Sequence, residues 1–165
     1  MEKLQDIFGH LDGVPQQTSF TKFHLQENCR NTRSIVNYLE TIVSKPIDTF
    51  KRAPVGDEVV IESFESADKL IVWLNNELKT LLQTEKIHEE QILLILNLPK
   101  SESSLATCET LAGLPLKAID NKARIQKNTI NYSSINTFKG LEVDIVFAID
   151  FVFSDNKKEL NKLYT

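Results

Sequence analysis

The chain has 165 residues, enough for one domain with a sizeable core. Its composition, 41% hydrophobic and 25% charged with five glycines and five prolines, is typical of a soluble globular protein and excludes collagen-like and low-complexity classes. The formal net charge of −4 argues against a free-standing nucleic-acid binder, which usually has a basic face. Two cysteines make no disulfide framework, and neither a membrane-spanning run nor a signal peptide is evident, so we expect a cytoplasmic protein without a membrane partner.

The first quarter of the chain predicts one strand and one helix. Residues up to about Gln17 show weak periodicity and end in a turn-like stretch. Aromatic residues alternate in Thr18–Leu25, which favours a short strand. A helix is expected from Arg33 to about Val43, capped by Asn31 or Thr32, because its apolar residues recur at helical spacing.

The middle of the chain predicts a β-α-β succession. Lys45–Asp57 contains prolines and a glycine and is expected to form an irregular connection or an edge hairpin. Glu58–Phe64 is a candidate strand, and leucines at helical spacing predict a helix over about Ala67–Gln83. Gln91–Asn97 is a short continuous apolar run, typical of a strand buried on both faces.

The remaining segments continue this alternation. A helix is expected from Ser101 to about Leu111, closed by a glycine and a proline. Leu116–Ile119, Ile130–Phe138 and Val143–Phe151 are expected to be strands.

The order of these elements predicts an α/β fold with a mainly parallel sheet and helices on both faces. We expect the strands at 91–97 and 143–150 to be central in the sheet. Five of their residues are then predicted to be buried: Ile92, Leu94, Leu96, Val146 and Ile149.

The segment from Gln26 to Ile35 contains a candidate anion-binding residue. Arg30 follows a predicted strand and precedes a predicted helix. A guanidinium group is planar and always charged, and it can grip phosphate oxygens through two hydrogen bonds. The alternative is a surface arginine that pairs with Glu27 or with solvent. Asn28 and Asn31 suit turn and cap positions, and Arg33 suits a solvated helix face.

The segment from Ser134 to Asp150 resembles a ligand loop mounted on a buried strand. A polar stretch with Lys139, Gly140 and Glu142 runs directly into the apolar residues 143–149. Gly140 permits a tight turn or a close approach of the backbone to a ligand. Ligands in parallel α/β sheets bind at the carboxyl ends of strands, and both segments have polar residues at or beside a strand end. The alternative is a polar turn between two strands, with Lys139 solvated.

Together these two segments resemble motifs IV and V of UvrD/Rep-type superfamily 1 helicases, in order and in context. The resemblance implies a RecA-like three-layer fold, with residues 18–165 as the second RecA-like domain, truncated before motif VI. It also implies that residues 1–17 are the connecting segment from a first helicase domain that lies outside this chain. The matching pattern departs at Cys29, where the family often has an aromatic residue.

The resemblance assigns a role to each matching residue. Arg30 is implied as the catalytic arginine that neutralises charge on the γ-phosphate of ATP. Glu142 is implied to contact the ribose or to order the γ-phosphate site, with Gly140 beside the nucleotide. Gln5, in a short stretch similar to the end of motif III, is implied as a further nucleotide contact.

Three more residues are implied to contact nucleic acid. Thr137 matches the family's backbone-contacting threonine or serine, and Lys139 offers a phosphate contact. Asn136 stands where the family usually has histidine, so a hydrogen-bonding group is kept but the contact differs.

The expected activity is therefore ATP-dependent translocation on nucleic acid by a longer parent protein. ATP with Mg²⁺ is the implied cofactor of that parent, while this chain is expected neither to bind ATP tightly nor to hydrolyse it. It contains no phosphate-binding G-x-x-x-x-G-K-[ST] loop and no metal-ligand cluster. The implied partners are the first RecA-like domain and single-stranded DNA, with RNA as the alternative.

Two other functions fit parts of the sequence. The first is a non-catalytic α/β binding or scaffold domain that keeps the helicase fold. The second is a small doubly wound domain of the response-regulator kind, which needs an acidic cluster at its strand ends. Asp144 and Asp150 are too isolated in the sequence to provide that cluster.

Overall fold

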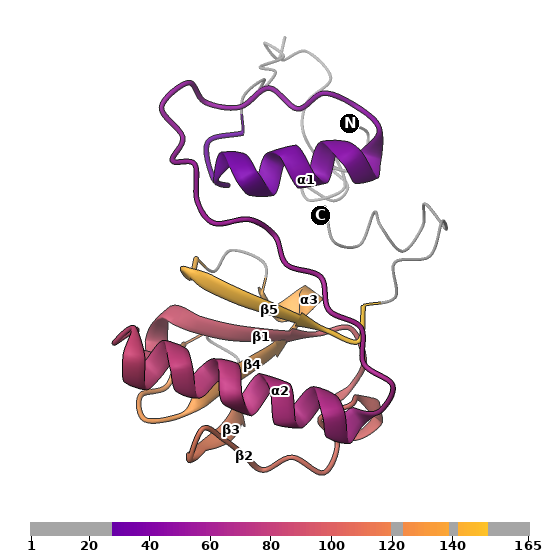
Figure 1. Cartoon of the computed structure of the whole chain (residues 1–165), viewed down its shortest axis with the longest axis vertical. Helices are drawn as coiled ribbons and strands as arrows, with labels where there is room; N and C mark the ends of the chain where they lie inside the picture. The colour runs from indigo at the N-terminus through magenta and orange to yellow at the C-terminus, as the bar shows by residue number, and fades with distance from the viewer. Residues whose placement is uncertain (1–27, 120–123, 139–141, 152–165) are drawn as a thin grey trace, which may run out of the picture. The chain divides into compact units, whose positions relative to one another are not determined.

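The computed structural model describes residues 28–119, 124–138 and 142–151 (Figure 1). The chain divides into two compact units between Glu58 and Val59. The predicted strand Thr18–Leu25 lies outside the described residues.

The first unit is built around helix α1 (Arg33–Val43), whose predicted bounds are confirmed. Thr32 is its N-cap, and Ser44 ends it in the left-handed conformation. The return segment is irregular, apart from a single bridge between Asn28 and Thr49, as expected for residues 45–57.

The second unit contains a five-stranded, mostly parallel mixed sheet in the order β2-β3-β4-β1-β5. The strands are β1 (Ile92–Leu96), β2 (Thr110–Leu111), β3 (Leu114–Ala118), β4 (Ile130–Ser134) and β5 (Ile145–Ile149). The pairs β1–β4, β1–β5 and β3–β4 are parallel, and only the short β2 runs antiparallel to β3. The predicted α/β class with a mainly parallel sheet is confirmed.

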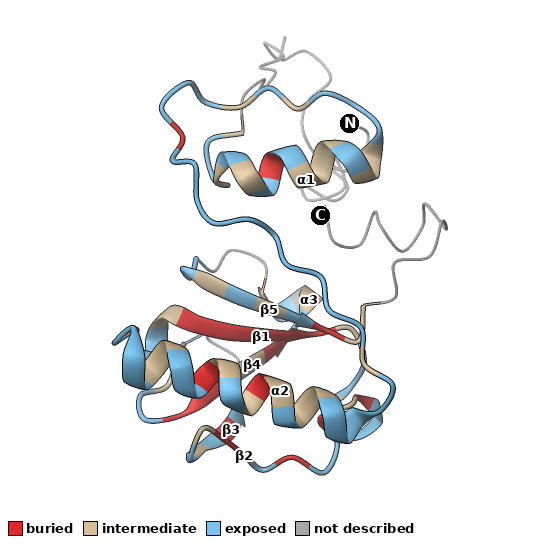
Figure 2. Cartoon of the chain, viewed as in Figure 1, coloured by how far each residue is buried: buried red, intermediate tan, exposed pale blue. Residues whose placement is uncertain are grey.

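Helix α2 (Ala67–Lys79) covers one face of this sheet (Figure 1). Ser66 caps it, and its last turn continues as a π-helical turn, Thr80–Thr84, so the predicted helix to Gln83 is confirmed in outline. The residues of this core that have no exposed surface include Leu74, Leu78, Ile92, Leu94, Leu105, Leu111 and Ile130. All five residues of β1 are buried, as predicted for a strand covered on both faces (Figure 2).

A smaller cluster packs on the other face. Leu93 and Ile95 of β1, with Ile119, pack against the short helix α3 (Ile135–Phe138) and against Val143 and Phe151 on either side of β5. The connections that follow β1 and β4 therefore pack on opposite faces, since Leu105 belongs to the α2 side.

The prediction of a strand over Glu58–Phe64 is wrong, because this segment pairs with no described strand and is mostly exposed. The prediction of a helix over Ser101–Leu111 is also wrong. A 3-10 turn, Lys100–Glu102, is followed by turns and by β2. The Ser103 hydroxyl bonds the Lys100 carbonyl and accepts from the Leu105 N–H, and such local bonds compete with helix.

The two strands predicted near the end of the described chain are present, but both are shorter than predicted. β4 ends at Ser134, whose hydroxyl accepts from the Thr137 N–H and so begins α3. β5 is the last strand on its side of the described sheet rather than a central one. Ile92, Leu94, Leu96 and Ile149 are buried as predicted, but Val146 is 44% exposed.

Within the described residues, no helix is long and apolar enough to cross a membrane.

Candidate functional site

Arg30 lies in a turn that the Asn28 side chain builds. Asn28 Oδ1 accepts hydrogen bonds from the backbone N–H groups of Arg30 and Asn31, both at 3.0 Å. The predicted turn role of Asn28 is thereby confirmed. Arg30 itself is exposed.

The N-terminal amides of α1, just after this turn, are already engaged. The Arg33 and Ser34 N–H groups donate to the carbonyls of Pro54 and Val55, at 2.9 and 3.0 Å. The Ile35 N–H donates to Thr32 Oγ1. Free amides at a helix N-terminus can bind phosphate, but these have intramolecular partners. An anion bound here would therefore be held by side chains, and the arginines at this end of the helix are Arg30 and Arg33.

Arg33 is exposed, as expected for a solvated helix residue, and its side chain also makes a hydrogen bond. Its Nη2 atom donates to the Lys51 carbonyl at 2.7 Å, which ties the start of α1 to the returning chain.

Thr137 lies on α3, beyond the carboxyl end of β4. It is exposed, and its hydroxyl group lies 3.1 Å from that of Ser134. Hydroxyl groups are neutral donors and acceptors that suit contacts to a phosphate backbone. Asn136 is part of the same helix, but its side chain lies outside what the structure describes, as do Lys139, Gly140 and Gln5.

Glu142 is exposed and precedes β5 by three residues. It therefore approaches the amino end of a strand, whereas Ser134 closes the carboxyl end of the parallel strand β4. Polar groups of this segment therefore lie beside strand ends, as expected. However, Ser134 lies at the carboxyl end of its strand, whereas Glu142 lies near the amino end of the other.

The structure reveals a polar cluster at the carboxyl ends of β1 and β5 that the sequence analysis missed. The Asp150 carboxylate accepts from the Ser104 N–H at 2.9 Å and from the Ser104 hydroxyl. Asn97 Nδ2 donates to the Asp150 carbonyl at 3.1 Å. Asp150 adopts a positive φ of 62°, which asparagine and aspartate tolerate better than most residues. The cluster holds the loop after β1 against the end of β5.

This edge has the topology of ligand sites in open α/β sheets. The connections after the neighbouring strands β1 and β4 diverge to opposite faces, and in open α/β sheets ligands bind at the carboxyl ends of such a pair of strands. Ser134 and Asn97 follow or end those strands. A polar residue directly after a buried strand, such as Asn97 or Asp150, is the sequence signal that locates this edge.

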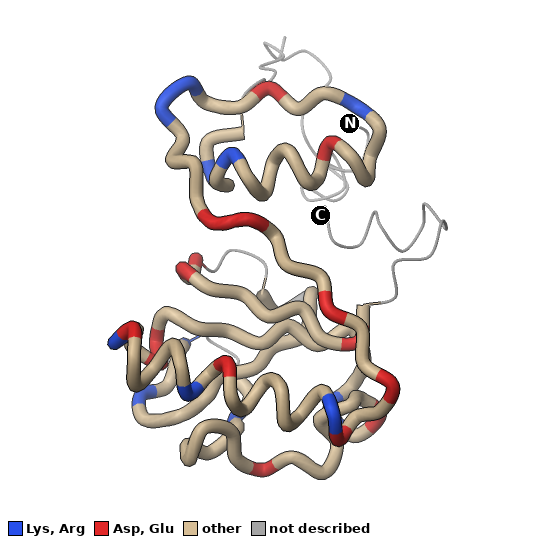
Figure 3. The backbone as a smooth tube through the Cα atoms, in the orientation of Figure 1, with Lys and Arg blue, Asp and Glu red and all other residues tan. Residues whose placement is uncertain are grey.

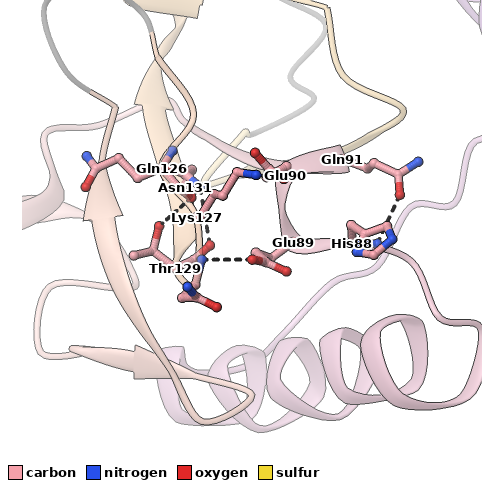
Figure 4. Close-up of polar contacts among 9 residues, drawn as sticks. His88, Glu89, Glu90, Gln91, Gln126, Lys127, Thr129 and Asn131 are labelled. Atoms are coloured by element: carbon pink, nitrogen blue, oxygen red, sulfur yellow. Dashed lines mark hydrogen bonds and ion pairs between the residues drawn. The ribbon is translucent and has the colours of Figure 1, made fainter.

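A second polar network lies at the amino ends of the strands (Figure 4). The Asn128 N–H donates to Glu89 Oε1 at 2.8 Å, and Gln91 Nε2 donates to Asp144 Oδ2 at 2.6 Å. The Asn128 N–H is the main cause of a pKa of the Glu89 carboxyl below its ordinary value. Asp144 and Asp150 thus lie at opposite ends of β5 and do not form the acidic cluster of a response-regulator-like site.

The residues that the resemblance assigns to one nucleotide are therefore found in two separate units. Arg30 belongs to the unit that ends at Glu58, and Glu142 belongs to the unit that begins at Val59. Their convergence on one ligand remains a prediction. Among the described residues, no group of three or more His, Cys, Asp or Glu side chains is arranged to hold a metal ion.

Comparison with known proteins adds no relative: no protein-family model, no curated protein and no solved structure matches this chain.

Proposed function

We propose that this chain is the second RecA-like domain of an ATP-dependent DNA helicase or translocase of superfamily 1. In this role it supplies half of an ATP site and part of the path for single-stranded nucleic acid. A longer parent protein provides the first RecA-like domain, which holds ATP and Mg²⁺. Domain closure on ATP then moves the pair along the strand.

The observation that carries the proposal is the environment of Arg30. It is exposed on a turn fixed by Asn28, beside helix amides that are already hydrogen-bonded. An arginine held in this way can reach a phosphate on a neighbouring domain with its backbone already ordered, which lowers the entropy cost of the contact. The motif-like segment around Thr137 and Glu142, and the mostly parallel sheet, support the same assignment.

The rival proposal is a non-catalytic α/β binding domain with the same fold. The two functions differ in what Arg30 does, because only a motor loses ATP turnover when the arginine is removed. Removing an interaction made with transition-state charge lowers kcat by about 10²- to 10³-fold.

The test is DNA-stimulated ATP turnover by the parent protein carrying Arg30→Ala. We expect turnover to fall by about a hundredfold or more with unchanged thermal unfolding, since an exposed arginine contributes little stability. The matched control is Arg52→Ala, which removes another exposed arginine of the same unit and is expected to leave turnover unchanged. Full turnover in the Arg30→Ala protein would favour the binding domain.

A second experiment measures ATP hydrolysis by the 165-residue chain alone. Residues 1–165 are expected not to hydrolyse ATP, because one arginine and one glutamate offer little against the entropy of binding. Robust hydrolysis by this chain would contradict the proposal.

A further inference from the structure

A shallow groove lies on α2, in the unit that begins at Val59. It has a volume of about 420 Å³ and is lined by Asp68, Lys69, Val72, Trp73 and Asn76. Val72, which lines the groove together with Trp73, leaves 61% of its surface exposed. The groove therefore offers apolar surface to a partner.

Trp73 is held in place within this groove. The Phe64 ring lies against it at a centroid distance of 5.3 Å, and the Phe147 ring of β5 meets it edge-on at 6.2 Å. Aromatic contacts of this geometry fix the indole ring before any ligand arrives. Preordered aromatic residues are the usual anchors of protein interfaces.

The segment Val59–Phe64 approaches the groove through Phe64 and carries further apolar surface. Val59, Val60 and Ile61 are 38%, 72% and 50% exposed. The segment has no assigned helix or strand, and within the described part of the chain no other residue hydrogen-bonds its backbone. A segment whose N–H and C=O groups have no partner among the described residues can pair with an incoming strand, which is the β-augmentation mode of peptide recognition.

The charges around this surface are mostly negative. Glu62 belongs to the segment Val59–Phe64, and Glu65 and Asp68 lie at the start of α2 (Figure 3). Lys69 is the cation of the groove, and its Nζ is already paired with Glu65. The uncompensated charge is therefore negative and favours a cationic partner.

We propose that Val59–Phe64 and the Trp73 groove together bind an extended, basic segment of a partner protein. Its main chain pairs with the backbone of Val59–Ser63, one apolar side chain enters the groove, and lysines or arginines face Glu62 and Asp68. A second copy of this chain would place like charges together, and nucleic acid or an anionic membrane would be repelled. The inference does not depend on the helicase assignment.

The first test uses Trp73, the one tryptophan of the sequence, as an intrinsic fluorescence probe. The ligand is a synthetic peptide of alternating leucine and lysine, and its counterpart alternates leucine and glutamate. We expect a saturable change in Trp73 emission with the lysine peptide that weakens as salt is added, and no response to the glutamate peptide. Equal responses to both peptides would overturn the proposal.

Variants locate the binding surface. Val72→Asp is expected to abolish the response, and Glu62→Lys with Asp68→Lys to weaken affinity by about tenfold or more. Glu85→Lys is the matched control, because it reverses an exposed charge that does not line the groove. An unchanged affinity in Val72→Asp, with the fold verified by circular dichroism, would contradict the assigned site.

Hydrogen exchange tests the strand pairing directly. The amides of Val59–Ser63 should exchange rapidly in the chain alone and become protected by at least about tenfold when the lysine peptide binds. Protection in the absence of peptide would mean that these groups already have a partner and would overturn the proposal. Peptide binding without new protection would contradict pairing through the main chain.

Discussion

Glu89 shows how one backbone contact sets the chemistry of a side chain. The Asn128 N–H donates to its carboxylate, and this bond, followed by one from its own backbone, lowers the pKa of Glu89. Because the folded-state pKa is depressed, this carboxylate stabilises the fold at pH values above its unfolded-state pKa, which is about 4.5. That stability is lost as the pH falls through the lower folded-state pKa.

We therefore predict that Glu89→Gln lowers the free energy of unfolding at neutral pH, and that the difference shrinks as the solution becomes acidic. Urea titrations over a pH series measure both quantities. Glu102→Gln is the control, because the Glu102 carboxylate is exposed and hydrogen-bonds no other described residue. A Glu89→Gln effect that grows in acid would have the wrong sign for this account.

At the scale of an element, the start of α1 depends on a glycine that is distant in sequence. Gly56 has a φ of +71°, and a Cβ atom there would lie 2.5 Å from the Cβ atom of Thr32, the helix N-cap. Gly113 has a similar φ of +82° but open space around it. Substituting alanine at each glycine therefore distinguishes two costs. At Gly113 only the left-handed backbone conformation is unfavourable, and at Gly56 a steric clash is added.

We predict that Gly113→Ala costs about 1–2 kcal/mol for the left-handed conformation alone. Gly56→Ala should cost a further 1–3 kcal/mol or so, because the cap must move to make room. The loss of stability is measured by hydrogen exchange, at the α1 amides for Gly56→Ala and at the β3 amides for Gly113→Ala. If Gly56→Ala loses no more stability than Gly113→Ala, Thr32 moves aside at little cost and the prediction is wrong.

The elements differ in how well the sequence predicts them. The bounds of α1 and the buried strand β1 follow from periodicity and from a continuous apolar run, which are local signals. Ser101–Leu111 has helical spacing as well, but Ser103 and Lys100 bond nearby carbonyls and the chain turns instead. Glu58–Phe64 has the composition of a strand, yet strand formation requires a partner, and none is found among the described residues. The exposure of Val146 follows from the edge position of β5, which composition alone does not reveal.

At the scale of the whole molecule, the sequence predicts the parts of the candidate site better than their arrangement. The Asn28 turn and the exposure of Arg30 follow from local chemistry. The cluster of Asp150, Ser104 and Asn97 could not be predicted, because it joins residues from separate loops through the sheet order. Whether Arg30 and Glu142 meet at one nucleotide depends on two units that local sequence patterns do not relate.

The central claim is that these two residues act on the same ATP, and a double-mutant cycle tests it most directly. DNA-stimulated ATP turnover is measured in the parent protein, in Arg30→Ala, in Glu142→Ala and in the double variant. Residues that serve one transition state are strongly non-additive. We predict that each single change lowers turnover and that the double variant is much less impaired than the product of the two single effects. Purely multiplicative effects, or full turnover in either single variant, would contradict the account.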